Sequence, residues 1–238
     1  MITFEEQLEF FKLIGGELKE KAECCVIGGS AMMFYNAKAE TKDVDLVFME
    51  QGSLDRVKQA LHNLGFEDKK ESIVIFKRYE SAKTKPVMMV KGEERFDLFL
   101  KEVITFKMSD AVMERVKEAH EFDNLIVKVA SPEDIILLKC ATERAKDRDD
   151  ASSLIKLFNI NWETIINESI YQSTATPYLF PVFLFDFLYE LKEDLKADIP
   201  KEVLFRIRKL SEDMLLKKLK KQGTKKIRKK KVKLKTRK

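Results

Sequence analysis

The sequence predicts an α+β fold, in which a mixed β-sheet with flanking helices is followed by a C-terminal helical bundle. Strand-like and helix-like segments alternate up to about residue 130, whereas only helical patterns follow until the chain becomes strongly basic. At the junction, Ser131 to Asp134 has the pattern of a helix start: a capping serine, a proline at the first helical position and acid in the first turn. We therefore expect three units: residues 1–130, a helical domain over residues 131–221, and a basic, disordered tail over residues 222–238.

Hydrophobic spacing predicts the elements of the first unit in order. Apolar residues at helical spacing predict a first helix, and a short apolar run that ends in Gly28-Gly29 predicts a strand followed by a turn. Ser30 is suited to cap the next helix, and Gly65 to end the one after the second strand. The predicted elements are helices at 3–20, 30–36 and 53–64 and strands at 24–27, 44–48, 73–76, 87–90, 96–100 and 125–129; we expect the strands at 73–76, 87–90 and 96–100 to be antiparallel neighbours.

The second unit shows only helical patterns. The predicted helices cover residues 134–158, 161–171, 178–195 and 200–221. Four phenylalanines in the third of them are interpreted as core rather than as a platform for stacking bases: Phe180, Phe183, Phe185 and Phe187.

Composition limits the class of protein. The chain has 238 residues, 45% of them hydrophobic and 36% charged, which is enough to build a sizeable core. The first residues lack a signal-peptide pattern, and no apolar run reaches the roughly 18 residues needed to span a bilayer, so we expect a cytoplasmic protein without a membrane partner. Cys24, Cys25 and Cys140 lack metal-ligand spacing and are predicted to be reduced and buried, and neither His62 nor His120 stands in a catalytic pattern.

The charge of the chain is divided unevenly. Residues 217–238 hold 14 Lys or Arg and no acid. Removing these 14 from the 45 Lys and Arg of the chain leaves 31 against 40 Asp and Glu, so residues 1–216 carry a net charge of −9. A basic segment of this kind favours nonspecific binding to a nucleic-acid backbone, although a solubilising or membrane-contacting extension has the same composition.

Two aspartates mark the second predicted strand. Asp43 and Asp45 point to the same side, because side chains in a strand repeat every two residues. Two carboxylates on one face repel each other unless a cation lies between them, and Mg²⁺ takes oxygen ligands of this kind. Asp97, in the apolar run "RFDLFL", is the candidate for a third carboxylate of a two-metal site.

The turn upstream of these aspartates suits a phosphate. Gly28 and Gly29 allow a ligand to approach the backbone closely. The N-terminus of the following helix offers free N–H groups and a positive dipole end, and Ser30 adds a hydroxyl.

Together these motifs resemble the DNA-polymerase-beta-like nucleotidyltransferase superfamily. The match consists of Gly-Gly-Ser at 28–30, twelve intervening residues, Asp-Val-Asp-Leu at 43–46 with Thr41 before it, and Asp97 on a later strand. Residues 132–154, with a Lys and a "K-D-x-x-D" stretch, are similar to the small prokaryotic branch that contains abortive-infection and toxin-type nucleotidyltransferases. The resemblance covers roughly residues 22–160.

The resemblance implies a fold, a reaction and a set of roles. It implies a nucleotidyltransferase-type sheet over residues 1–130 and transfer of a nucleoside monophosphate from an NTP to a hydroxyl of RNA, such as tRNA, or of protein, with release of pyrophosphate. Asp43 and Asp45 would hold two Mg²⁺ ions, for which Mn²⁺ can substitute. Asp97 would complete the second metal site and help to activate the acceptor hydroxyl. The nucleotide-binding residues would be Gly28, Gly29, Ser30, Thr41, Lys139, Arg144 and Lys146.

Two other functions are compatible with parts of the pattern. The same fold could serve as a non-catalytic module that binds nucleic acid or a partner, although three carboxylates beside a phosphate backbone are unfavourable without metal. An Asp-x-Asp pair also occurs in sugar-nucleotide glycosyltransferases, but too few strands precede this pair for a nucleotide-sugar domain. The sequence does not indicate the oligomeric state.

Overall fold

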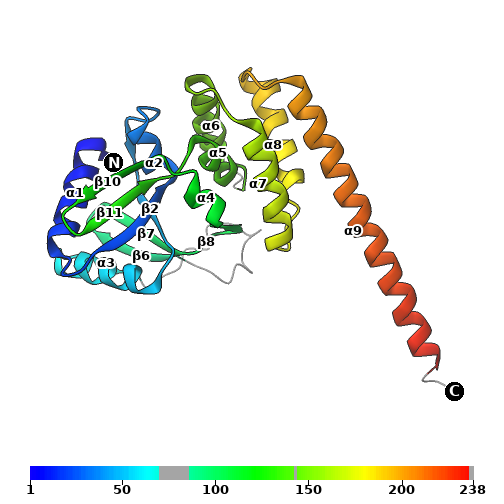
Figure 1. Cartoon of the computed structure of the whole chain (residues 1–238), viewed down its shortest axis with the longest axis horizontal. Helices are drawn as coiled ribbons and strands as arrows, with labels where there is room; N and C mark the ends of the chain where they lie inside the picture. Colours follow the sequence, from blue (N-terminus) through cyan, green and yellow to red (C-terminus); the bar gives the residue numbers. More distant parts are fainter. Residues whose placement is uncertain (70–85, 142–143, 236–238) are drawn as a thin grey trace.

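The structure, a computed structural model, describes residues 1–69, 86–141 and 144–235, with side chains as far as Lys220. This part of the chain contains a seven-stranded mixed sheet with helices packed against it, followed by a run of helices (Figure 1). The predicted α+β fold with a helical C-terminal region is therefore confirmed.

The order of the strands in the main sheet differs from their order in the chain. From one edge to the other the strands are β10 (Glu118–Phe122), β11 (Leu125–Val129), β2 (Ala22–Ile27), β4 (Val44–Phe48), β7 (Glu94–Leu100), β6 (Val87–Lys91) and β5 (Glu67–Asp68). The β6–β7 hairpin is antiparallel, as predicted, whereas β4 and β7 run parallel. Leu46, Val47 and Phe48 in the central strand β4 are all buried, so both faces of the sheet are covered.

Three helices pack on the sheet within the first part of the chain. They are α1 (Phe4–Glu17), α2 (Gly28–Phe34) and α3 (Gln51–Asn63). Helix α1 starts with a capping box, in which Thr3 accepts a hydrogen bond from the Glu6 backbone and Glu6 accepts one from the Thr3 backbone. A two-stranded ladder of β1 (Ile2–Thr3) and β3 (Glu40–Thr41) ties the chain start to the segment that leads into β4.

Small elements connect the sheet to the helical part. β8 (Glu102–Val103) and β9 (Phe106–Lys107) form a short hairpin, and α4 (Asp110–Glu114) follows it. The edge strand β10 was not predicted, because its polar residues do not alternate as a half-buried strand does. The strand predicted at 73–76 lies outside the described residues.

The later helices are α5 (Pro132–Cys140), α6 (Ala145–Leu157), α7 (Trp162–Ala175), α8 (Phe180–Leu195) and α9 (Lys201–Lys235). Ser131 caps α5 as predicted, with its hydroxyl accepting a hydrogen bond from the Asp134 backbone at 3.2 Å. The single helix predicted over 134–158 is wrong, because α5 ends at Cys140 and α6 starts again at Ala145. Uninterrupted helix propensity concealed this break, which folds the start of α6 back onto α5.

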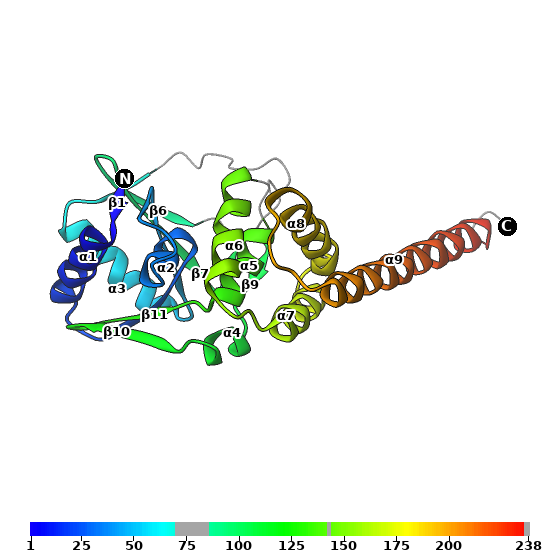
Figure 2. The ribbon, with the colours of Figure 1, turned by 90° about the horizontal axis from the view of Figure 1, so that it is seen from above.

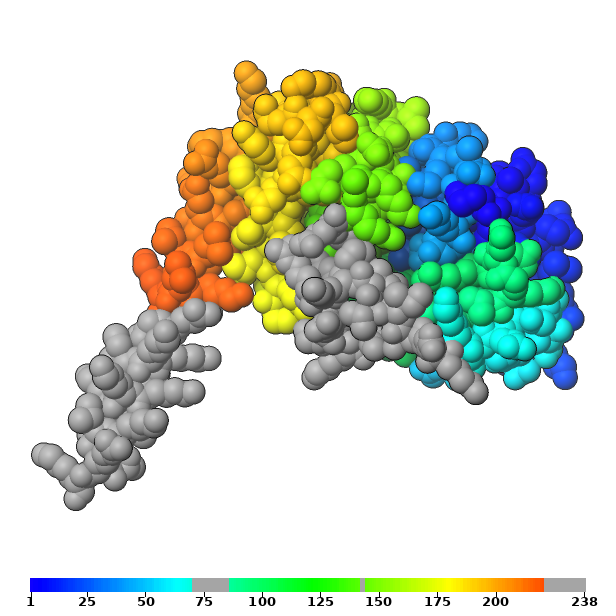
Figure 3. Space-filling view, turned by 180° about the vertical axis from the view of Figure 1, so that it is seen from behind, coloured from blue at the N-terminus to red at the C-terminus, as the bar shows by residue number. Residues whose placement is uncertain are grey.

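Helix α9 leaves the body of the protein after its first turns. Val203, Ile207 and Ser211 lie one turn apart and are buried, and the Ser211 hydroxyl donates to the Pro181 carbonyl of α8 at 2.7 Å. Figure 2 shows the remainder of α9 extending away from the other helices, and Figure 3 shows α8 and the start of α9 side by side in yellow and orange. The described helix reaches Lys235 and so runs through most of the segment for which the sequence predicts disorder, which agrees with the high helix propensity of Lys and Arg.

Two further findings concern individual expectations. Ser30 does not cap its helix, because α2 already begins at Gly28 and no side chain caps it. Within the described residues, no helix is both long enough and apolar enough to cross a membrane.

Candidate functional site

Parallel pairing of β4 and β7 brings the three predicted acids together. Asp45 lies directly opposite Asp97 in the register, and Asp43 lies two residues before Asp45, just before β4 begins. We call Asp43, Asp45 and Asp97 the acidic cluster. Burial raises the pKa of Asp45 well above its ordinary value, and the charges of Asp43 and Asp97 raise it further.

An arginine that the sequence analysis missed lies on the acidic cluster. The Arg95 Nε donates to Asp97 Oδ1 at 2.7 Å, its Nη2 donates to Asp97 Oδ2, and its Nη1 lies 3.9 Å from Asp43 Oδ2. The hydrogen bond to Asp97 raises the pKa of Arg95, whereas burial raises the pKa of Asp97 despite that bond. The alternation of side chains in β7 was a usable signal, because Arg95 and Asp97 are two residues apart and share a face.

The predicted glycine turn packs directly on the acidic cluster. Gly28 has a φ of +62°, and a Cβ at this position would lie 2.8 Å from Asp45 Oδ2. A Cβ on Gly29 would lie 2.7 Å from Thr41 Oγ1. A side chain at either position would therefore have to push its neighbour aside, and for Gly28 that neighbour is an acid of the cluster.

The two predicted hydroxyl residues have structural partners. Ser30 is fully buried, and its hydroxyl donates to the Asp43 carbonyl at 3.1 Å. Thr41 is also buried, against Gly29. In this structure Ser30 positions the segment that carries Asp43, rather than presenting its hydroxyl to solvent.

The basic residues at the α5–α6 junction form ion pairs with nearby acids. Lys139 is buried and donates to Asp147 Oδ1 at 2.9 Å and to Asp150 Oδ2, and the Arg144 Nε donates to Asp147 Oδ2 at 2.9 Å. Lys38, which the sequence analysis did not single out, donates to Asp150 Oδ1 at 2.5 Å.

These cations also act on the acidic cluster. The positive charges of Lys139 and Arg144 oppose the rise in the pKa of Asp45. Burial and then the charge of Arg144 lower the pKa of the exposed Lys146, and Asp43 opposes that decrease. The junction therefore places positive charge within electrostatic range of Asp43 and Asp45, as the predicted phosphate contacts require.

The chemistry of the acidic cluster suits a hard divalent cation. Within the described part of the chain, the Asp45 carboxylate accepts no hydrogen bond and forms no ion pair. Carboxylate oxygens are the ligands that Mg²⁺ and Mn²⁺ prefer. As they stand, the described side chains include no group of three His, Cys, Asp or Glu arranged to hold a metal ion, and the contacts of Asp97 are with Arg95.

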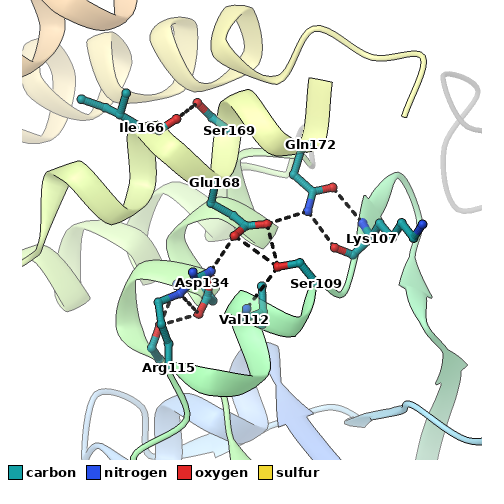
Figure 4. A network of polar contacts seen from close by, with 10 residues as sticks. Lys107, Ser109, Val112, Arg115, Asp134, Ile166, Glu168, Ser169 and Gln172 are labelled. Atoms are coloured by element: carbon teal, nitrogen blue, oxygen red, sulfur yellow. Dashed lines mark hydrogen bonds and ion pairs between the residues drawn. The ribbon is translucent and has the colours of Figure 1, made fainter. Parts of the chain in front are cut away.

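A second polar network, not predicted from the sequence, joins the α4 segment to α5 and α7 (Figure 4). Arg115 Nη2 donates to Asp134 Oδ1 at 2.6 Å and to Glu168 Oε2 at 2.8 Å. The Gln172 side chain donates to Glu168 at 2.9 Å and to the Lys107 carbonyl at 2.7 Å. We call Arg115, Asp134, Glu168 and the groups bound to them the Arg115 network; a hollow of about 370 Å³ lies beside it, lined in part by Ser109, Thr164 and Tyr171.

Comparison with solved structures finds chains of similar length at low identity. The crystal structure of JHP933 from Helicobacter pylori is 17% identical over 92% of this chain and 93% of that one, with a TM-score of 0.40. An antigenic nucleotidyltransferase-like protein from Paracoccidioides brasiliensis is 15% identical over 86% of this chain and 99% of that one, with a TM-score of 0.39. Among curated proteins, none matches this chain.

A family model provides the assignment. It matches residues 5–179, which include the whole acidic cluster, the glycine turn and the α5–α6 junction, and it describes nucleotidyltransferases of unknown function (DUF6036). Because the match covers well over half of the chain, this protein belongs to that family of nucleotidyltransferases.

Proposed function

We propose that the protein transfers a nucleoside monophosphate from an NTP to a hydroxyl acceptor and releases pyrophosphate. The single observation that carries this proposal is the parallel register of β4 and β7, which sets Asp45 opposite Asp97 with Asp43 beside them. Membership of a nucleotidyltransferase family supports the reaction class.

In this reaction the acceptor oxygen attacks the α-phosphorus, and the bond from that phosphorus to the oxygen that bridges it to the β-phosphate breaks. The electron pair of that bond leaves with pyrophosphate. Asp43, Asp45 and Asp97 would hold two Mg²⁺ ions, or Mn²⁺ in their place, and the bound ions would neutralise phosphate charge and polarise the acceptor hydroxyl. Asp97 would take the proton of that hydroxyl, directly or through water.

The remaining residues bind and neutralise the triphosphate. Gly28 and Gly29 keep the turn free of side chains, so that phosphate oxygens can approach the backbone. Arg144 and Lys146 are exposed at the start of α6 and supply positive charge for the leaving pyrophosphate. Lys139 is buried and forms ion pairs with Asp147 and Asp150. It therefore adds to the positive potential beside Arg144 and Lys146 without touching the phosphates itself.

The experiment is a labelling assay. Wild-type protein is incubated with each of the four α-labelled NTPs, Mg²⁺ and total RNA and protein of the source cell, and nuclease or protease digestion then identifies the acceptor. We expect Asp45→Asn and added EDTA each to reduce labelling by about a hundredfold to a thousandfold, the order of a lost transition-state electrostatic contact. The control is Asp186→Asn, an exposed acid on α8. Equal labelling by wild type and Asp45→Asn would contradict the proposed site.

We also propose that the acceptor or a docking partner is a nucleic acid held by the basic segment 217–238. Its 14 cations and lack of acids favour phosphate backbones over specific bases. Replacing six of its lysines by glutamine should weaken binding to a labelled RNA and flatten the dependence of log Kd on log salt. If the slope of log Kd against log salt is unchanged, the basic segment does not bind the RNA backbone and this proposal is wrong.

A further inference from the structure

We propose that Arg95 acts as a built-in substitute cation: it neutralises the acidic cluster while no divalent metal is bound, and it must leave for the metal to bind. This inference rests on the proposed function, because it concerns how the metal site of that reaction is filled. According to this inference, the position of the Arg95 side chain determines whether the acidic cluster can bind a divalent cation.

The contacts of Arg95 carry the inference. Its guanidinium engages both oxygens of Asp97 and lies 3.9 Å from Asp43, so one side chain spans two of the three acids. Planar, bidentate pairing of this kind is the strongest that an arginine makes with a carboxylate. Asp97 is only 4% exposed, so in the absence of metal its charge needs a partner from the protein.

A metal ion and this guanidinium compete for Asp97 as it stands. Mg²⁺ requires ligand oxygens at about 2.0–2.1 Å in near-octahedral geometry. With both Asp97 oxygens directed at Arg95, a cation at the cluster would lie against a second positive charge. In its present position Arg95 therefore opposes the binding of a metal.

Arg95 is placed so that it can move. About a quarter of its side-chain area is exposed, and besides the two acids its described contact is with the Met88 sulfur, a weak acceptor. A long side chain of this kind can rotate into solvent without disturbing the core. An NTP brings several negative charges with the metal, so the complex of metal and nucleotide displaces Arg95 more readily than the metal alone does.

The test measures Mn²⁺ binding to the full-length protein by calorimetry, with and without a non-hydrolysable NTP. Arg95→Met should bind Mn²⁺ alone at least tenfold more tightly than wild type. In EDTA its melting temperature should be below that of wild type, and Mn²⁺ should raise it by more. Arg148→Met is the matched control, because Arg148 is similarly exposed and pairs with Glu190 of α8, away from the acidic cluster.

The outcomes separate this inference from the proposed function. If wild type and Arg95→Met bind Mn²⁺ equally well, Arg95 does not compete and the inference is overturned, while the metal-dependent function stands. If no variant binds Mn²⁺ even with nucleotide, the proposed function fails first. If Arg95→Met does not fold, the same measurement is made with Arg95→Gln, which removes the charge but keeps a hydrogen-bond donor for Asp97. If Arg95→Gln binds Mn²⁺ with the affinity of wild type, the inference is overturned.

Discussion

The acidic cluster and the Arg115 network are built from the same residue types in opposite ways. In each, one arginine pairs with two carboxylates: Arg115 with Asp134 and Glu168, which are both buried, and Arg95 with the buried Asp97 and with Asp43, which is 23% exposed. In the Arg115 network both acids have several donors: Asp134 accepts from Arg115 and from the Ser131 hydroxyl, and Glu168 accepts from Arg115, Ser109 and Gln172. In the acidic cluster three acids meet one arginine, and among the described contacts Asp45 has no donor.

The difference separates a structural use of buried charge from the cation-binding use that we propose for the acidic cluster. A network in which every acid is hydrogen-bonded stabilises the junction of two parts of the chain. An excess of carboxylates at the pairing of β4 and β7 is unfavourable until a cation neutralises it, so such a cluster favours the binding of a cation. The four predictions below test this contrast, from the largest expected effect to the smallest.

Breaking the Arg115 network should have the largest effect on stability. Arg115→Met leaves Asp134 and Glu168 buried without a cation, which should lower the free energy of unfolding by about 3–5 kcal/mol. Urea unfolding measures this, with Arg206→Met as the control, since Arg206 forms a solvent-screened pair with Glu163 at the surface that contributes little to stability. A loss below that of the control would show that the network contributes little.

Adding a methyl group at the glycine turn should reduce activity more than stability. Gly28→Ala carries a left-handed backbone cost of about 1–2 kcal/mol and pushes against Asp45 Oδ2, so labelling should fall at least tenfold. Gly92→Ala is the matched control: it has a φ of +60° with nothing within 4 Å of its Cβ, so it should share the cost and keep the activity. The stability and the labelling rate of both variants are measured. If Gly28→Ala labels the acceptor as fast as Gly92→Ala does, the reaction does not depend on the present position of Asp45.

Removing the central charge of the cluster should stabilise the metal-free protein. The pKa of Asp45 is raised in the folded state, so ionisation costs stability; the cost is absent below the unfolded pKa of about 3.8 and grows as the pH rises toward the folded pKa. In EDTA at pH 7.5, Asp45→Asn should raise the melting temperature by about 2–4 °C, the shift produced by about 1 kcal/mol in a chain of this size. The difference from wild type should vanish near pH 4. If Asp45→Asn melts at a lower temperature than wild type at pH 7.5, the charge of Asp45 is already neutralised by its surroundings in the metal-free protein.

The smallest effect concerns the hydrogen bond that positions Asp43. Ser30→Ala should cost about 1 kcal/mol of stability and lower the labelling rate, because its hydroxyl holds the Asp43 carbonyl at 3.1 Å. Ser211→Ala removes a buried hydroxyl bound to the Pro181 carbonyl, outside the site, and should cost a similar amount of stability with no change in labelling. Equal labelling rates in the two variants would limit Ser30 to a purely structural role.

Most elements and the acids of the cluster could be predicted from the sequence, because both depend on local patterns. The helix start at Ser131, the strand at 44–48 and the spacing of Asp43 and Asp45 each involve neighbouring residues. The break between α5 and α6 was missed, since propensity favours helix throughout that segment, whereas in the fold Asp147 and Asp150 of α6 pair with Lys139 of α5.

The sequence by itself determined which side chains are available: paired carboxylates, a glycine turn, a basic segment and a third acid in an apolar run. Only the tertiary structure decided which of them meet. Lys38 and Asp150 are 112 residues apart in the chain, and Arg115 and Glu168 are 53 apart. Periodicity reports the conformation of a segment but not its neighbours, whereas the parallel contact of β4 with β7 sets Asp97 against Asp45 and brings Arg95 with it.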